Sequence, residues 1–270
     1  MPEQFTSSHK FRQRYWTRSF LGYPTILRAK PNSSHLAISK LESDGYIDRL
    51  ITQNVDGLHQ LAGTSNILEL HGNLHEIQCL NCGHTKSRSE FQEILSELNP
   101  GWKRFLDNID ITESKVNPDG DYELDQERSF GEGSRSDMKK LSPRVNPDGD
   151  IDLPLDASYT TFRYPPCFQC LAGVYKPSVV FFGENIRPMV KHESLEMVTN
   201  CEFLMVIGST LATYSAYRLV RSAKELGKKV VILNMGETRG DSLADVKIES
   251  ECGKVLAGIV ERLNNGGDGS

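Results

Sequence analysis

Four of the six cysteines form two Cys-x-x-Cys pairs, Cys79 with Cys82 and Cys167 with Cys170. Two thiolates on one tight turn are half of a tetrahedral zinc site, and four make a closed, structural site. Redox-active or free cysteines are the alternative interpretation. We favour zinc because the first residues lack the apolar segment of a secretory signal, so disulfide bonds are unexpected in a chain of this length.

A second group of reactive side chains follows two short apolar runs. Residues 47–51 lead into the polar stretch 53–59, and residues 67–70 lead into His71. Runs rich in Ile and Leu predict buried strands, and parallel strands bring the groups at their carboxyl ends into one crevice. Because a histidine with a pKa of about 6.5 can accept a proton at neutral pH, His71 is a candidate general base. A hydrogen-bonded core histidine is the alternative.

Two further strand ends carry small residues. Small side chains let a ligand approach the backbone, and free N–H groups at a helix start favour anions. A side-chain amide can also hold a ribose or a base edge. Purely structural turns are the alternative for each, but three such turns in one sheet favour a nucleotide crevice. The two turns are Gly208, Ser209 and Thr210, and Asn234, Met235 and Gly236.

Alternating helices and strands must position these groups. Such alternation predicts an α/β fold, a Rossmann-like parallel sheet with right-handed crossovers and helices on both faces, beside a small zinc-binding lobe. We expect strands at 47–51, 67–70, 179–182, 203–207, 230–233 and 246–248, and helices at 11–27, 33–44, 188–200, 215–226 and 252–263.

The expected domains follow from these elements. Residues 11–78 and 176–263 form the Rossmann-like domain, and 79–175 form the zinc-binding lobe. Within the lobe, the segment 107–152 holds 13 acidic and 6 basic residues, and VNPDGD occurs in it twice. We predict a disordered acidic insertion at about 107–160 and a flexible tail at 264–270. The repeat lacks the spacing of an EF-hand calcium loop.

Bulk properties exclude several classes of protein. The net charge is -5 over 270 residues, so no general affinity for nucleic acid is expected. The chain contains no apolar run of about 18 residues, so we expect no membrane-spanning helix.

Several motifs together resemble the sirtuins, a family of NAD-dependent protein-lysine deacylases. They are TQNVDGLH (52–59), LHG (70–72), KPSVVFFGE (176–184), VIGSTL (206–211), LNMG (233–236) and the two cysteine pairs. RQRYW (12–16), NPDGD and Cys252-Gly253 look most like class II, the mitochondrial sirtuin-four type. The resemblance covers about 11–106 and 160–263. The family's first strand and glycine-rich NAD loop lie upstream of RQRYW, and we expect both to be missing here.

The resemblance implies NAD and Zn²⁺ as cofactors, acyl-lysine proteins as partners and the mitochondrial matrix as location. It makes His71 the general base and the four paired cysteines the zinc ligands. The residues implied to bind NAD are Gln53, Asn54, Val55, Asp56, Gly208, Ser209, Thr210, Asn234, Met235, Gly236 and Cys252. An extended substrate peptide pairs with a segment that contains Val179, Phe181, Phe182, Gly183 and Glu184.

The implied reaction is acyl transfer from lysine to ADP-ribose. The acyl-lysine oxygen attacks C1′ of the nicotinamide ribose, nicotinamide leaves, and His71 takes a proton from a ribose hydroxyl. Two alternatives stay open at this point. The same NAD site could transfer mono-ADP-ribose to protein, or the chain could be a catalytically inactive, zinc-stabilised binding module.

Overall fold

The structure is a computed structural model that describes residues 2–108, 115–116, 122–123, 144–145, 151–152 and 159–266. The chain divides into two compact units. We call Met1–Ala29 with Leu74–Gly183 the cysteine unit, and Lys30–Asn73 with Glu184–Ser270 the sheet unit. The predicted boundaries placed residues 11–29 with the parallel sheet. In the structure they belong to the cysteine unit, because aromatic side chains of this segment build its core.

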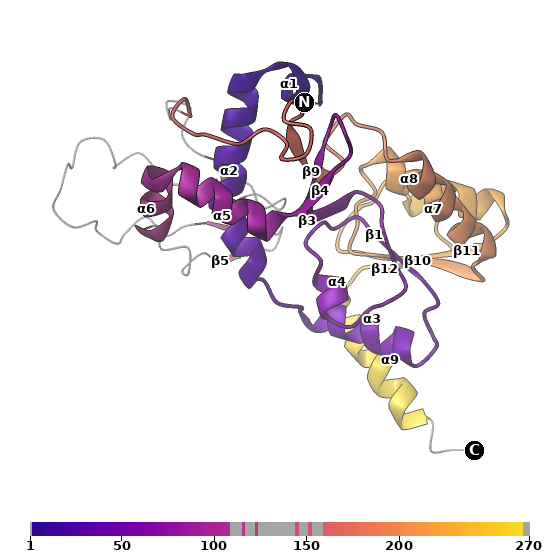
Figure 1. Ribbon diagram of the computed structural model, residues 1–270. Helices are drawn as coiled ribbons and strands as arrows, with labels where there is room; N and C mark the ends of the chain where they lie inside the picture. The colour runs from indigo at the N-terminus through magenta and orange to yellow at the C-terminus, as the bar shows by residue number, and fades with distance from the viewer. Residues whose placement is uncertain are drawn as a thin grey trace. The chain divides into compact units, whose positions relative to one another are not determined.

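Parallel strands form the centre of the sheet unit. β1 (Leu50–Thr52) pairs with β2 (Ile67–Glu69), and β10 (Phe203–Ile207), β11 (Lys229–Leu233) and β12 (Val246–Ile248) follow one another in a second parallel ladder (Figure 1). Side chains alternate between two apolar clusters along β10 and β11, as a pleated strand requires.

Helices cover both faces of the β10–β12 ladder. Val230 and Ile232 face a cluster with side chains of α7 (Pro188–Asn200) and α8 (Tyr214–Glu225). Leu233 faces the opposite cluster, built with α3 (Ser33–Ser43) and α9 (Cys252–Gly266), which lie side by side (Figure 1). The predicted Rossmann-like arrangement is confirmed. The remaining short elements of this unit are α4 (Leu58–Leu61) and a 3₁₀ turn at Asp241–Leu243.

Most predicted elements of the sheet unit are present with small shifts. The strand expected at 47–51 begins only at Leu50, and α3 is capped by Asn32, whose Oδ1 accepts from the backbone N–H groups of Ser34 and His35. The strand expected at 179–182 is wrong. β9 is Tyr175–Val179, because Phe181 turns into an aromatic cluster instead of continuing the ladder.

The cysteine unit contains elements that the sequence did not reveal. A sheet in the order β4-β3-β9 is built from β3 (Gly72–Cys79), β4 (Thr85–Ser87) and β9. α1 (Pro2–Ser7), α2 (His9–Arg28), α5 (Arg88–Leu98) and α6 (Pro100–Asn108) are the described helices of this unit. α2 includes the helix expected at 11–27. α5 was missed because its apolar face is short, with Phe91 and Leu95 as its fully buried apolar side chains.

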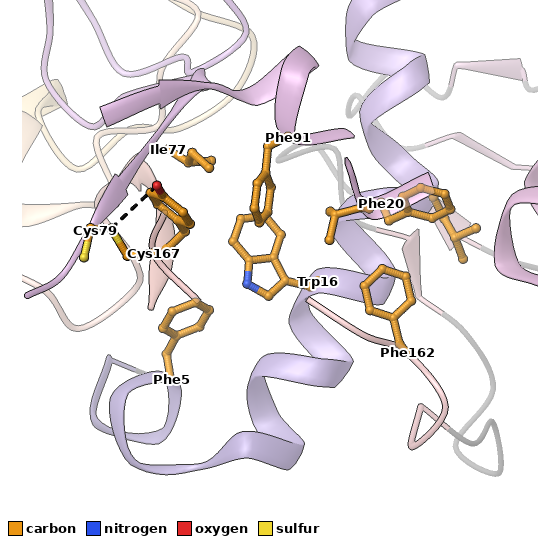
Figure 2. Close-up of a cluster of buried hydrophobic side chains, with 11 residues drawn as sticks. Phe5, Trp16, Phe20, Ile77, Cys79, Phe91, Phe162 and Cys167 are labelled. Atoms are coloured by element: carbon orange, nitrogen blue, oxygen red, sulfur yellow. Dashed lines mark hydrogen bonds between the residues drawn. The ribbon is translucent and has the colours of Figure 1, made fainter. Parts of the chain in front are cut away.

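An aromatic core holds the cysteine unit together. Trp16 packs on Phe91 with ring centroids 4.9 Å apart, while Phe20 lies 5.6 Å from Phe162 (Figure 2). All four side chains are fully buried. Removing one such ring would cost about 3–5 kcal/mol. Figure 2 also shows Cys79 and Cys167 at the edge of this core, so the cysteine pairs rest on a rigid base.

The acidic insertion predicted at 107–160 lies largely outside the described residues. Within it the structure describes four two-residue strands that pair antiparallel in the order β5-β6-β7-β8: Lys115–Val116, Tyr122–Glu123, Arg144–Val145 and Ile151–Asp152. For the predicted tail, residues 264–266 are the end of α9, and 267–270 lie outside the described residues. Among the described residues, no helix combines the length and apolar composition that a membrane span requires.

Candidate active site and metal centre

The polar residues predicted from the sequence lie where the parallel strands of the sheet unit end. The stretch 53–56 follows β1, His71 follows β2, and 208–210 follow β10 (Figure 1). The backbone after β10 is left-handed at two nearby residues, Gly208 (φ 59°) and Leu211 (φ 56°). Glycine adopts this conformation freely, but at a buried leucine it stores strain, which is common at functional sites.

Gln53 connects three elements of the crevice. Its side-chain Nε2 donates to Ser209 Oγ at 2.8 Å, and its Oε1 accepts from Thr213 Oγ1 at 3.1 Å. Ser209 Oγ also accepts from the backbone N–H of Leu211 at 3.1 Å. One amide thus ties the end of β1 to the loop after β10 and to the residue before α8.

His71 is hydrogen-bonded at both ring nitrogens. Nδ1 lies 3.2 Å from the backbone oxygen of Gln53, and Nε2 lies 2.8 Å from Ser215 Oγ. A carbonyl oxygen can only accept, so Nδ1 carries the proton of the neutral ring and Nε2 keeps its lone pair. Burial lowers the pKa of His71 from its ordinary 6.5, and the Gln53 carbonyl opposes this shift. The neutral ring therefore predominates at neutral pH, with Nε2 able to accept a proton.

A second group of predicted residues meets beside this network. Cys252 Sγ lies 3.5 Å from where a Cβ on Gly208 would stand, so the thiol borders the turn after β10 at ordinary contact distance. Asn234 is buried, and its side-chain amide donates to the backbone oxygen of Met235 at 2.7 Å. Burial raises the pKa of Cys252, which keeps it a neutral thiol.

Other predicted cofactor residues present open surface. Gly208, Thr210, Met235 and Gly236 are exposed at the strand ends, as is Asn54. Val55 is half-buried. Asp56 Oδ1 accepts from the backbone N–H of Leu58 at 3.0 Å and so starts α4. The strand ends therefore combine a fixed polar network with accessible backbone, which suits a ligand rich in hydroxyl and phosphate groups.

The four paired cysteines meet at one point in the cysteine unit. All four sulfur atoms lie within 4.8 Å of one another, with Cys79 and Cys170 at 3.8 Å and Cys82 and Cys167 at 3.6 Å. Four thiolates around zinc at about 2.3 Å would lie about 3.8 Å apart, so the donor set fits a tetrahedral zinc ion.

Backbone amides around the cysteines favour the thiolate form. The N–H groups of Asn81, Gln169 and Gly173 point at three of the sulfur atoms from 3.3–3.4 Å. The Asn81 side-chain amide, followed by backbone N–H groups, lowers the pKa of Cys170 to about 6. These donors suit the anionic sulfur ligands that a metal ion requires.

Gly173 is required by the closeness of this packing. A Cβ at that position would lie 2.3 Å from Cys79 Sγ and 2.8 Å from Asn81 Cβ. Because neither atom is the free end of a flexible chain, any side chain at 173 must displace the sulfur site.

The predicted peptide-binding residues fall at the end of the cysteine unit. Val179 closes β9, Phe181 packs edge-on against Phe5 with ring centroids 5.5 Å apart, and Phe182 is 78% exposed. Gly183 has a φ of 90° and is the last residue of this unit, so Glu184 begins the second segment of the sheet unit.

Two hydroxyl residues of the crevice were not predicted. Thr213 and Ser215 were overlooked because the helix was expected to begin at 215. The signal was present, since hydroxyl residues gather at helix starts, where they usually cap the backbone. Here the two hydroxyl groups bond to Gln53 and His71 instead.

The sequence matches known proteins along most of its length. The model described as the Sir2 family matches residues 1–215. "NAD-dependent protein deacylase SIR4" of Batrachochytrium dendrobatidis is 43% identical over 97% of this chain and 78% of its own length. "NAD-dependent protein deacylase Sirt4" of Drosophila melanogaster is 37% identical over 97% of this chain and 72% of its own length.

Solved structures agree with the fold. The chain superimposes on Sir2Tm, solved bound to a propionylated peptide, with a TM-score of 0.65 and 25% identity. The superposition covers 98% of this chain and 82% of that one.

Proposed function

Because the chain belongs to the Sir2 family, we propose that it is an NAD-dependent deacylase that transfers acyl groups from protein lysines to ADP-ribose with release of nicotinamide. The observation that carries this proposal is the fixed tautomer of His71. Its Nδ1 donates to the Gln53 carbonyl, so Nε2 keeps the lone pair that can accept a proton, with Ser215 Oγ 2.8 Å away. The ring lies at the strand ends, where small residues leave the backbone accessible.

Each part of the crevice has a task in this reaction. Bound NAD would supply an electrophilic ribose carbon from which nicotinamide departs. The stretch 53–56 would hold the nicotinamide and its ribose, with Gln53 fixed by Ser209 and Thr213. His71 would take a proton at Nε2 from a ribose hydroxyl. The adenosine half of NAD would be lined by Gly208, Ser209, Thr210, Asn234, Met235, Gly236 and Cys252.

The remaining residues act in binding and structure. Cys79, Cys82, Cys167 and Cys170 would hold a zinc ion that stabilises the fold and takes no part in the chemistry. The acyl-lysine peptide would pair as an added strand along a segment with Val179, Phe181, Phe182, Gly183 and Glu184.

The test is turnover of acyl-lysine peptides by the wild-type chain and by His71→Gln. We expect NAD-dependent release of nicotinamide and deacylated peptide, which His71→Gln should reduce by about 10²–10⁴-fold because the general base is lost. His192→Gln on the exposed surface of α7 is the matched control and should keep full activity. Equal turnover by His71→Gln and wild type would refute the proposed role of His71.

The two alternatives give different results in the same assay. A binding module would release no nicotinamide before or after the substitution. A mono-ADP-ribosyltransferase would move label from NAD to protein in a manner that depends on His71. The names of the relatives favour deacylation over both.

We also propose that the protein works in the mitochondrial matrix. The support is its resemblance to the sirtuin-four type and its similarity to the Drosophila protein named Sirt4. Fractionation of source cells, with detection by an antibody to this chain, tests the location.

A further inference from the structure

Ser215 faces the nitrogen of His71 that would accept the proton. It lies in the first turn of α8, and its Oγ is 2.8 Å from Nε2. Both residues are half-buried and belong to the sheet unit. Because Nδ1 must donate to the Gln53 carbonyl, the neutral ring leaves one arrangement, in which the serine O–H donates to Nε2.

A hydroxyl group suits this position in both states of the ring. It donates to Nε2 while the ring is neutral. After Nε2 has taken a proton, the same oxygen can accept from the new N–H. Hydrogen bonds to charged groups are stronger than those between neutral groups, so the hydroxyl favours the protonated ring. A methyl group could do neither.

The backbone of Ser215 is itself held in place. Arg218 Nε donates to the backbone oxygen of Ser215 at 3.2 Å, and Arg218 Nη2 donates to Ser194 Oγ at 3.0 Å. Arg218 is buried, and Ser194 lies on α7. The charged side chain thus fixes the first turn of α8 to the neighbouring helix, and the serine hydroxyl points at His71 from a rigid support.

We propose that Ser215 is the positioning residue of His71, holding the ring ready through Nε2 and accepting the N–H that forms when the ring takes the ribose proton. This inference rests on the proposed function of the site. The serine hydroxyl first turns its hydrogen away and so frees the one lone pair of Nε2. The proton then moves from the ribose hydroxyl to Nε2, and the resulting N–H donates to Ser215 Oγ. Ser215 neither gains nor loses a proton, and it acts only through His71.

The first test needs no turnover. Imidazole ¹⁵N spectra of the full chain give the tautomer and pKa of His71, with His71→Gln to assign its signals. Ser215→Ala should lower the pKa of His71 by about half a unit to one unit, because the protonated ring loses its acceptor. Ser215→Thr keeps a hydroxyl and should stay near the wild-type value. An unchanged pKa in Ser215→Ala would overturn the inference.

The second test measures catalysis against pH. In Ser215→Ala, the acidic limb of the kcat–pH profile should move to lower pH by the same half a unit to one unit. The value of kcat at the optimum pH should fall about three- to tenfold. KM for NAD should stay constant, and Ser215→Thr should recover most of kcat. A rise in KM at constant kcat would overturn the inference in favour of simple cofactor binding.

The two tests separate failure of the inference from failure of the proposed function. If His71→Gln retained full turnover, the proposed general base would be wrong, and the positioning role in catalysis would fall with it. If His71→Gln lost turnover but Ser215→Ala kept the wild-type profile and pKa, only the inference about Ser215 would fail. The melting temperatures of both Ser215 variants show whether the fold is intact.

Discussion

The two polar centres of this protein satisfy their polar groups in opposite ways. In the cysteine unit, four sulfur atoms converge within 4.8 Å, and backbone N–H groups point at them. In the sheet unit, the side chains bond to one another while the exposed glycines and Thr210 leave the backbone open. The first arrangement is complete once a single ion is added, whereas the second leaves backbone groups exposed to a ligand. We therefore expect the closed centre to stabilise the fold and the open centre to perform the chemistry.

The largest expected effect comes from removing two ligands of the closed centre. Cys167→Ser combined with Cys170→Ser should abolish zinc binding and the cooperative unfolding of the cysteine unit, since zinc contributes roughly 10 kcal/mol or more in small zinc domains. Bound zinc by atomic emission and near-ultraviolet circular dichroism of the aromatic core measure the loss. Cys201→Ser, a half-buried cysteine on the sheet unit, is the control and should keep both signals. Unchanged unfolding of the double variant would show that the centre has no structural role.

The next effect tests how tightly the closed centre is packed. Gly173→Ala places a Cβ 2.3 Å from Cys79 Sγ, so the sulfur must move. We expect the affinity for zinc to fall about 10–100-fold, measured by competition with a chelator. Gly101→Ala in α6 meets no atom within 4 Å and should leave the affinity unchanged. Equal affinities in the two variants would mean that the centre tolerates displacement.

A smaller effect is expected at the open centre. Gln53→Leu removes the partner of both Ser209 and Thr213 and should lower the free energy of unfolding by about 1–3 kcal/mol. Urea denaturation measures the change. Gln60→Leu, the same substitution at an exposed position whose amide bonds to Glu69, is the control and should have little effect. If both variants were equally stable, the network around Gln53 would contribute nothing.

The smallest effect depends on pH. The rings of His35 and His59 are buried with centroids 4.5 Å apart, and burial lowers the pKa of both from 6.5. Below about pH 6.5 the unfolded chain therefore binds protons that the folded chain does not. Stability should be fully present above pH 6.5 and should decrease as the pH falls toward the folded-state pKa values, by at most about 1.4 kcal/mol per pH unit for each ring.

His59→Gln tests this pH dependence. In this variant the free energy of unfolding should depend less steeply on pH between pH 6.5 and 5. Denaturant titration at several pH values measures this dependence. His59 Nδ1 has no hydrogen-bond partner among the described residues, so replacing the ring breaks no hydrogen bond at that atom. His192→Gln on exposed α7 should leave the slope as it is. A variant slope equal to that of wild type would assign the pH dependence elsewhere.

The sequence predicted the closed centre better than the open one. Cysteine pairs at fixed spacing are recognisable however long the intervening chain, and the structure brings all four together. The strand ends around Gln53 and His71 were predicted from their apolar runs. Thr213 and Ser215 were not, because hydroxyl groups at a helix start normally cap it, and only the fold shows that they point to β1 and β2.

The helices and strands were likewise predicted best where their signals are local in the sequence. α7, β10 and β12 lie where the periodicity placed them, since each is a single apolar element with clear ends. β3 and α5 were overlooked, because their burial depends on aromatic partners from α2 that are distant in the sequence. The predicted domains placed residues 11–29 with the sheet, whereas they belong to the cysteine unit, since no local signal shows which core Trp16 and Phe20 join.

The left-handed backbone at Leu211 limits how this protein can be made more stable. Leu211 is 3% exposed and its side chain fills the space left by Gly240, where a Cβ would lie 2.5 Å from Leu211 Cδ1. Glycine at 211 would relieve the backbone but empty part of the core, and a larger residue at 240 would expel the leucine. Thermostabilising substitutions should therefore avoid this pair, because relaxing it would also release the loop that carries Ser209.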